Sequence, residues 1–287
     1  MNANFSGWGN GLVGVLIFSG SLPATRVAVA DLPPLFLTSV RAVIATLLGA
    51  GLLLLLRQKR PEKHDLMSLV FVALGVVIGF PLLTAFALES ISASRSIVFI
   101  GLLPLATAFF GVMRAGERPK PLFWVFALLG SAAVAGFAIS LGGAGTLYGD
   151  SLMIAAVIVC GWGYAEGAVL ARTLGGWQVI SWALVISVPV MAPVAFLTLP
   201  SSLAGVSAPA WAGLAYVSLF SMMIGFVFWY RGLAVGGIAT VGQLQLLQPF
   251  FGLLLAAALL DESVSPMMAA TTLAVVACVT LARSYAR

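Results

Sequence analysis

The chain has 287 residues, of which 61% are hydrophobic and only 8% are charged. Soluble domains contain about 45–50% apolar and about 25% charged residues, so this composition excludes a soluble globular protein and indicates a membrane protein. The formal net charge of +5 does not call for a nucleic-acid partner, because basic loops beside anionic lipid account for it.

Ten apolar stretches are long enough to cross a bilayer as helices, which takes about 20 residues each. The first lacks a basic leading region and a small-residue cleavage site, so we interpret it as a retained span and not as a signal peptide. Cys160 and Cys278 lie inside spans, which argues against a disulfide. The ten predicted spans, in chain order, are residues 8–29, 34–56, 66–88, 94–113, 121–140, 149–171, 177–197, 211–230, 238–259 and 266–283.

The distribution of basic residues predicts the orientation of these spans. With a cytoplasmic amino terminus, the inside loops hold eleven of the fourteen Lys and Arg residues. The opposite orientation would contradict the tendency of positive charge to stay inside, so we expect both termini in the cytoplasm. The eleven residues are Arg57, Lys59, Arg60, Lys63, Arg114, Arg118, Lys120, Arg172, Arg231, Arg283 and Arg287.

The second half of the chain repeats the first at a constant offset of 145 residues. The coinciding residues are Ala87-Leu88 with Gly232-Leu233, Pro104 with Pro249, Glu117 with Glu262, and Pro121 with Pro266. Each half holds five spans, an odd number, so the second half must enter the membrane upside down. We therefore predict an all-α polytopic membrane protein of ten transmembrane helices in two inverted five-helix repeats. The first unit comprises residues 1–145 and the second unit residues 146–287.

These repeated features resemble the EamA-type repeat of the drug/metabolite transporter superfamily. The resemblance rests on the Ala/Gly-Leu pair, the proline midway along the next helix, and the turn Gly116-Glu117-Arg118. The second copy of the turn, Asp261-Glu262-Ser263, departs from the Gly-Glu-Arg pattern. The length and the aromatic, glutamine-bearing second half are most similar to bacterial members that export aromatic amino acids and methionine.

What the resemblance implies is a transporter of the bacterial inner membrane that works by alternating access about a midplane cavity. Its substrates would be small neutral metabolites, foremost aromatic or apolar amino acids such as Phe, Tyr, Trp, Met or Thr-like molecules. An inverted duplication by itself also favours a transporter, since halves of this kind move about a shared site. A ten-helix unit holds a whole site, so we expect a monomer surrounded by lipid.

The two matched prolines are candidate helix breaks. A proline inside a helix removes one backbone donor and displaces the carbonyl four residues earlier, here those of Ile100 and Gln245. In a bilayer a displaced carbonyl must find protein, water or substrate. Pro104 and Pro249 therefore indicate either a wet cavity or a plain packing kink, and Pro23 in the first span is a third candidate break.

Three glutamines lie in the middle of the ninth span, at Gln243, Gln245 and Gln248. A carboxamide offers donors and acceptors without net charge, so it can hold a zwitterion at little cost. We predict that Gln245 and Gln248 bind substrate; hydrogen bonding between packed helices is the alternative. They align with Ile100 and Leu103, so the cavity would be polar on one side and apolar on the other.

Aromatic residues in mid-span are candidates to enclose an apolar substrate side chain. They are Trp162 and Tyr164 in the sixth span, Tyr230 at the end of the eighth, and Phe80 and Phe99 in the third and fourth. Mid-membrane Trp and Tyr need partners for their polar hydrogens, which a lined cavity provides. Packing against protein or lipid is the alternative for each.

Few charges lie within the spans. Glu166 has two interpretations: proton coupling, or an ion pair with a loop arginine. Arg41 is expected near the outer mouth, either attracting anions or paired with Asp31 or Glu89. A carrier of anionic metabolites, with Arg26 and Arg41 in the path, is therefore an alternative function.

Nothing in the sequence indicates an enzyme. His64 is the only histidine, so neither a His-based zinc site nor a Ser-His-Asp triad can be built. No P-loop motif is present. We expect no metal and no cofactor; a membrane-embedded scaffold or enzyme is the alternative from a different class.

Overall fold

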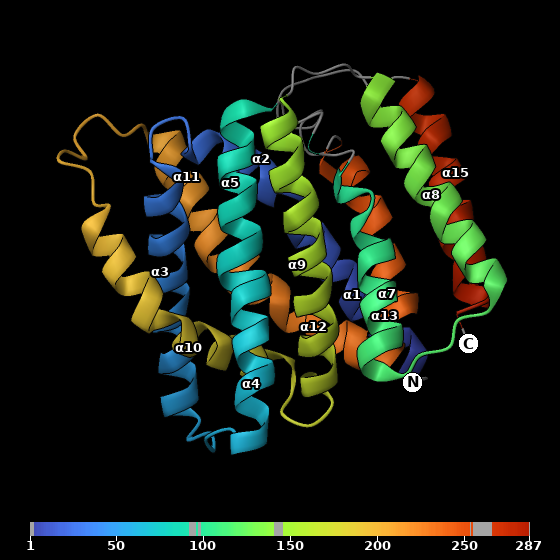
Figure 1. Ribbon diagram of the computed structural model, residues 1–287, viewed down its shortest axis with the longest axis horizontal. Coiled ribbons are helices and arrows are strands. Elements are labelled where there is room, and N and C mark those ends of the chain that lie inside the picture. The colour runs from blue at the N-terminus through green and yellow to red at the C-terminus, as the bar shows by residue number, and fades with distance from the viewer. Residues whose placement is uncertain are drawn as a thin grey trace.

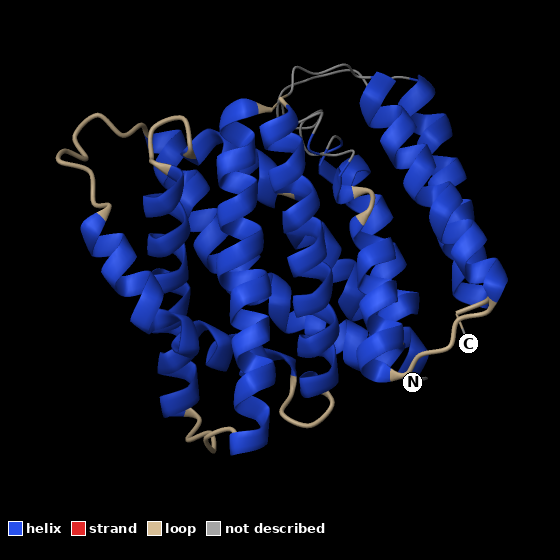
Figure 2. Ribbon diagram, viewed as in Figure 1, coloured by secondary structure: helices blue, strands red, loops and turns tan. Residues whose placement is uncertain are grey.

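The computed structural model describes residues 3–91, 96, 99–140, 146–252, 254 and 266–286. Over these residues the chain folds into helices without a β-strand (Figure 2). The helices stand in one bundle, with the two ends of the chain at the same end of it (Figure 1). Within the described residues, six continuous helical stretches are long and apolar enough to cross a membrane, and some of them combine two or three of the helices given below. Three shorter apolar helices accompany them.

The helices of the first unit fall on the first five predicted spans. The first span is divided into two helices, and the third into an α-helix, a π-helix and a second α-helix. Their bounds are α1 (Ala3–Ser19), α2 (Ser21–Ala28), α3 (Pro34–Leu55), α4 (Lys63–Val72), η1 (Ala73–Gly79), α5 (Phe80–Ser90), α7 (Leu103–Ala115) and α8 (Pro121–Ser140).

The helices of the second unit fall on the remaining five spans. The predicted turn at 261–263 and the end of the ninth span lie outside the described residues. The bounds are α9 (Leu147–Ala171), α10 (Gly176–Leu197), α11 (Ala208–Tyr216), η2 (Val217–Ile224), α12 (Gly225–Gly236), α13 (Ile238–Gly242), η3 (Gln243–Leu247) and α15 (Pro266–Ser284).

The two units interlock reciprocally, which confirms the predicted inverted duplication. Helix α1 of the first unit packs against α12 of the second, and α9 of the second packs against η1 and α5 of the first. Equivalent spans pair with each other at the edges, α3 with α10 and α8 with α15 (Figure 1). This exchange of partners is the packing that a two-fold relation in the membrane plane produces.

Glycines allow α1 and α12 to approach closely. A Cβ at Gly7 would lie 2.6 Å from the Cα of Gly236, and a Cβ at Gly232 would lie 2.7 Å from the backbone nitrogen of Gly11. Both distances are shorter than any real contact of a Cβ atom. Small residues therefore form this seam, as they do wherever membrane helices touch through their backbones.

A π-helical segment interrupts the third span of each unit at the same place. η1 covers Ala73–Gly79 and η2 covers Val217–Ile224, so the offset of 145 residues superimposes one on the other. π-Helical turns are rare and occur frequently at functional sites, because they displace the following residues around the helix axis. No proline marks either segment, and the sequence analysis did not find them.

The basic connections gather at one end of the bundle. The connections 56–62, 116–120 and 172–175 lie at the end that also holds both chain ends (Figure 1). At the opposite end, the backbone N–H and the hydroxyl of Ser207 donate to the Asp31 carboxylate and join the two units. These two donors hold the pKa of Asp31 below its ordinary value.

The glycine seam predicts that Gly7→Ala lowers the melting temperature. The added methyl group meets the backbone of Gly236, and overpacking of this kind costs about 1–3 kcal/mol. The matched control is Gly9→Ala in the same helix, where a Cβ meets nothing within 4 Å. Both variants gain the same helix propensity, so thermal melting in detergent isolates the packing effect. Equal melting temperatures for the two variants would contradict the close approach of α1 and α12.

Candidate functional site

A cavity lies where the interrupted spans of the two units meet. It offers about 40 Å³ to the centres of water molecules, which is room for a few waters. A larger organic molecule therefore fits only when the walls part. The lining residues are Phe18, Ser21, Leu22, Thr25, Arg41, Val76, Phe80, Pro81, Thr84, Leu103, Tyr164, Ser221, Phe226 and Gln248.

The cavity is lined by equivalent residues of the two units. Val76 of η1 and Ser221 of η2 are equivalent at the offset of 145 residues, and both line it. So do the equivalent residues Leu103 and Gln248. In both pairs the first unit contributes the apolar residue and the second unit the polar one. A duplicated frame thus encloses a chemically asymmetric space.

The polar wall is a chain of hydrogen bonds between helices. Ser21 donates to the hydroxyl of Ser221 over 2.8 Å, and the Nη2 of Arg41 donates to the same oxygen over 3.3 Å. Nearby, the Nε2 of Gln248 donates to the backbone carbonyl of Phe18 over 3.2 Å. The first two bonds join α2, α3 and η2, and the third joins α1 with the residue that follows η3.

Arg41 is buried, with 6% of its surface exposed. Neither of the carboxylates considered as partners pairs with it: in the described part of the chain it takes part in no ion pair. Asp31 binds Ser207 instead. The Nε of Arg41 has no hydrogen-bond partner among the described residues.

Another part of the cavity wall is aromatic. The rings of Phe18 and Phe226 meet edge to face with centroids 5.1 Å apart, and Tyr164 meets Phe226 in the same way at 5.9 Å. Phe80 completes the lining on the side of α5. Edge-to-face contacts of this kind hold the rings in fixed orientations. The wall thus presents a firm apolar surface to whatever enters the cavity.

Of the predicted site residues, Gln248, Tyr164, Phe80 and Arg41 line this cavity and the others do not. Gln245 is buried beside Gln243, and neither side-chain amide has a hydrogen-bond partner in the described residues. The assignment of Gln245 to a substrate site stays a prediction.

The other predicted aromatic residues pack elsewhere. Trp162 stacks on Phe71 and Phe110, with centroids 4.7 and 6.0 Å away. The hydroxyl of Tyr230 donates to the carbonyl of Gly163 over 3.2 Å. Phe99 packs both against the main apolar core and against a smaller cluster that contains Ile100 and Met153. These contacts are the packing alternatives that the sequence left open.

The prolines do not interrupt otherwise regular helices. Pro104 lies in the first turn of α7, where its missing N–H removes no helical hydrogen bond. Pro249 follows the 3-10 helix η3, within which the N–H of Gln248 bonds to the carbonyl of Gln245. The carbonyl of Gln245 thus finds its partner within the protein, which is one of the outcomes expected for a displaced carbonyl. The break in the first span falls at Gly20, between α1 and α2, and not at Pro23.

Two acidic residues, one in a span and one in a turn, form contacts at the end of the bundle that holds the basic connections. Glu166 pairs with Arg114, with Oε1 and Nη2 2.7 Å apart. This contact is the ion pair that was one of the two interpretations of Glu166. The Glu117 carboxylate accepts the backbone N–H groups of Ile238 and Ala239 at 2.7 Å each, and so caps the start of α13. The turn around Glu117 thus ties the first unit to the second.

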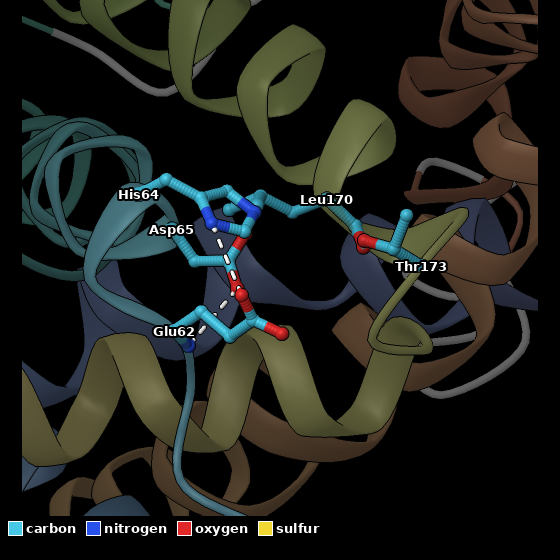
Figure 3. Close-up of polar contacts among 5 residues, drawn as sticks. All are labelled: Glu62, His64, Asp65, Leu170 and Thr173. Carbon is cyan, nitrogen blue, oxygen red and sulfur yellow. Dashed lines mark hydrogen bonds and ion pairs between the residues drawn. The ribbon is translucent and has the colours of Figure 1, made fainter.

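The only histidine has a local role. Its ring nitrogens lie 3.4 Å from a carboxylate oxygen of Glu62 and 3.2 Å from one of Asp65. Glu62 and Asp65 form the capping box that begins α4, and His64 lies between them in the sequence (Figure 3). Among the residues that the structure describes, no group of three or more His, Cys, Asp or Glu side chains is placed to hold a metal ion.

The sequence analysis missed Phe18, Ser21, Thr25, Thr84 and Ser221 as lining residues. The signal for Ser221 was available, because it is the polar counterpart of Val76 in the repeat. The others follow only from the break at Gly20 and from the way α2 and α5 face each other.

Comparison with known proteins agrees with this architecture. The sequence pattern described as "EamA-like transporter family" matches residues 6–139 and again residues 147–283. A Bacillus subtilis (strain 168) protein described as "Uncharacterized transporter YdeK" is 62% identical over 287 residues, covering 100% of both chains. A solved structure described only as "Crystal structure of protein" is 20% identical, with a TM-score of 0.80 over 96% of this chain and 98% of the other. That last similarity concerns the fold alone.

Proposed function

Since the chain belongs to the EamA-like transporter family, and is thus a membrane transporter, we propose that it carries small neutral metabolites. The best candidates are aromatic or apolar amino acids. They would bind in the cavity between the two units and leave the cell by alternating access.

One observation carries the proposal, namely that a polar wall and an aromatic wall face the same cavity. Arg41, Ser221 and Gln248 supply donors and acceptors on one side, while Phe18 and Phe226 supply aromatic faces on the other. An amino acid with an apolar side chain has the matching division between a polar head and an apolar body. Such a molecule leaves neither wall unsatisfied.

Transport requires the walls to separate, because the cavity holds only a few waters in this conformation. At the end with the basic connections, the path is crossed by the Arg114–Glu166 pair and by the Glu117 cap on α13. Both contacts join the first unit to the second. Tilting the units against each other would open this end only as these contacts part.

We place the chain in the bacterial inner membrane as a monomer. The end with connections 56–62, 116–120 and 172–175 faces the cytoplasm, because basic loops favour that side. Both termini are then cytoplasmic, and the Asp31–Ser207 contact faces outward.

Counterflow in liposomes tests the function. Purified protein is reconstituted into vesicles loaded with unlabelled phenylalanine or methionine, and uptake of the labelled compound is followed with and without a pH gradient. We expect uptake above protein-free vesicles that the gradient does not change, because no Asp or Glu of the described residues lines the cavity and Glu166 is paired. Absence of uptake of both compounds by folded protein would rule out the proposed substrates. Uptake that follows the gradient would return Glu166 to a coupling role.

Substitutions of Gln248 and of Gln245 are expected to affect counterflow differently. We expect Gln248→Leu, which places the residue type of Leu103 at its equivalent position, to reduce counterflow roughly tenfold or more, since it removes a hydrogen-bonding group from the cavity. Gln245→Leu is the comparison, because Gln245 lies outside the lining. If both variants insert equally, it should retain more activity than Gln248→Leu, and an equal loss would support the sequence-based assignment of Gln245 to the substrate site. Full activity of Gln248→Leu would remove that residue from the path.

A further inference from the structure

We propose that Arg41 is the binding group for a carboxylate on the substrate, and that the carrier selects its substrates by that carboxylate and not by the ammonium group. The inference rests on the proposed function in one respect, that the cavity is where substrate binds. It also identifies the group of the protein, the Arg41 guanidinium, that recognises the carboxylate of the substrate.

First, the positive charge of Arg41 has no anionic partner among the described residues. A buried arginine within a membrane is costly unless an anion or several acceptors meet it. Among the described residues, the hydrogen-bond partner of Arg41 is a neutral hydroxyl, that of Ser221 at 3.3 Å. Among the residues that the structure describes, no Asp or Glu lines the cavity that Arg41 faces. These residues leave the charge of Arg41 without an anionic partner, and an anion that enters the cavity would neutralise it.

The second step is the shape of the available donors. A guanidinium presents five N–H groups in a planar fork that fits the two oxygens of a carboxylate. Only Nη2 has a hydrogen-bond partner in the described residues, and Nε has none. The hydroxyl of Ser221 accepts from both Arg41 and Ser21, so its own hydrogen is left for donation. A carboxylate is a small group whose two oxygens accept from a guanidinium and a hydroxyl together.

The third step concerns the other end of the substrate. The described part of the lining offers an ammonium group no carboxylate; its neutral polar groups are hydroxyls and the Gln248 amide, beside aromatic faces. An ammonium group would thus find neutral partners, whereas a carboxylate finds a full positive charge. The carboxylate should therefore contribute more to binding, and an analogue that lacks the ammonium group should still bind.

Arg26 provides the matched control. It belongs to α2 of the same unit, and its guanidinium donates to the backbone carbonyl of Leu88. It does not line the cavity. If a general positive field attracted anions, replacing either arginine would have a similar effect. If Arg41 binds the carboxylate directly, only its replacement matters.

The test measures binding of labelled 3-phenylpropionate, which has the carboxylate and ring of phenylalanine without the ammonium group. We expect the wild-type protein to bind it, and unlabelled phenethylamine, which has the ring and ammonium group alone, to compete at least tenfold more weakly than phenylalanine. In Arg41→Gln we expect binding roughly 10- to 100-fold weaker, the range for hydrogen bonds to charged groups. Arg26→Gln should bind as the wild type does.

Folding is controlled by melting temperature and by Arg41→Lys, which keeps the charge but loses the fork and should bind with intermediate strength. If Arg41→Gln does not fold, the lysine variant carries the comparison. The inference is overturned if the wild-type protein does not bind 3-phenylpropionate, if phenethylamine competes as well as phenylalanine, or if every folded Arg41 variant binds like the wild type.

These outcomes are distinct from failure of the proposed function. A protein that binds 3-phenylpropionate through Arg41 but exchanges no amino acid would be a carrier of other carboxylates, and the inference would stand. A protein that exchanges phenylalanine equally well with and without Arg41 would keep the proposed function and lose the inference.

Discussion

The structure depends on the requirement that backbone groups inside a bilayer find partners within the protein. This chain interrupts its spans, and the two units supply each other's missing partners. Tyr216 of the second unit donates its hydroxyl to the carbonyl of Ile17, beside the break between α1 and α2. Glu117 of the first unit caps α13 of the second. Breaks that would be costly in a single unit are thereby stabilised where the units meet, and the cavity lies among them.

The sequence predicted the spans and the inverted duplication because both depend on coarse signals, namely apolar length and repeated Pro and Glu residues. It predicted less of the cavity, because lining depends on helix phase. The 3-10 helix η3 ends at Leu247, so Gln245 and Gln248 do not belong to one regular helix, and of the two only Gln248 lines the cavity. Neither π-helical segment has a marker in the sequence, although they bring Val76 and Ser221 to the cavity. Trp162 illustrates the same problem, since mid-span position does not reveal which neighbours a ring will face.

Duplication and divergence have separate physical roles in this fold. The duplicated frame supplies two equivalent arrangements of the units, which is what opening to either side of a membrane requires. Divergence supplies the chemistry, because Ser221 and Gln248 face the apolar Val76 and Leu103, while Arg41 has Ile186 as its counterpart. The cavity is therefore chemically asymmetric even though its scaffold is nearly symmetric.

The most direct test of this account is the accessibility of a cysteine at Ser221, in a chain that also carries Cys160→Ala and Cys278→Ala. The rate of modification of Ser221→Cys by a small membrane-impermeant thiol reagent is measured with and without saturating phenylalanine or methionine. We predict that substrate slows the reaction, while a cysteine at the exposed Ser284, remote from the cavity lining, reacts at an unchanged rate. An unchanged rate at position 221, in protein that exchanges these amino acids, would place the substrate path elsewhere.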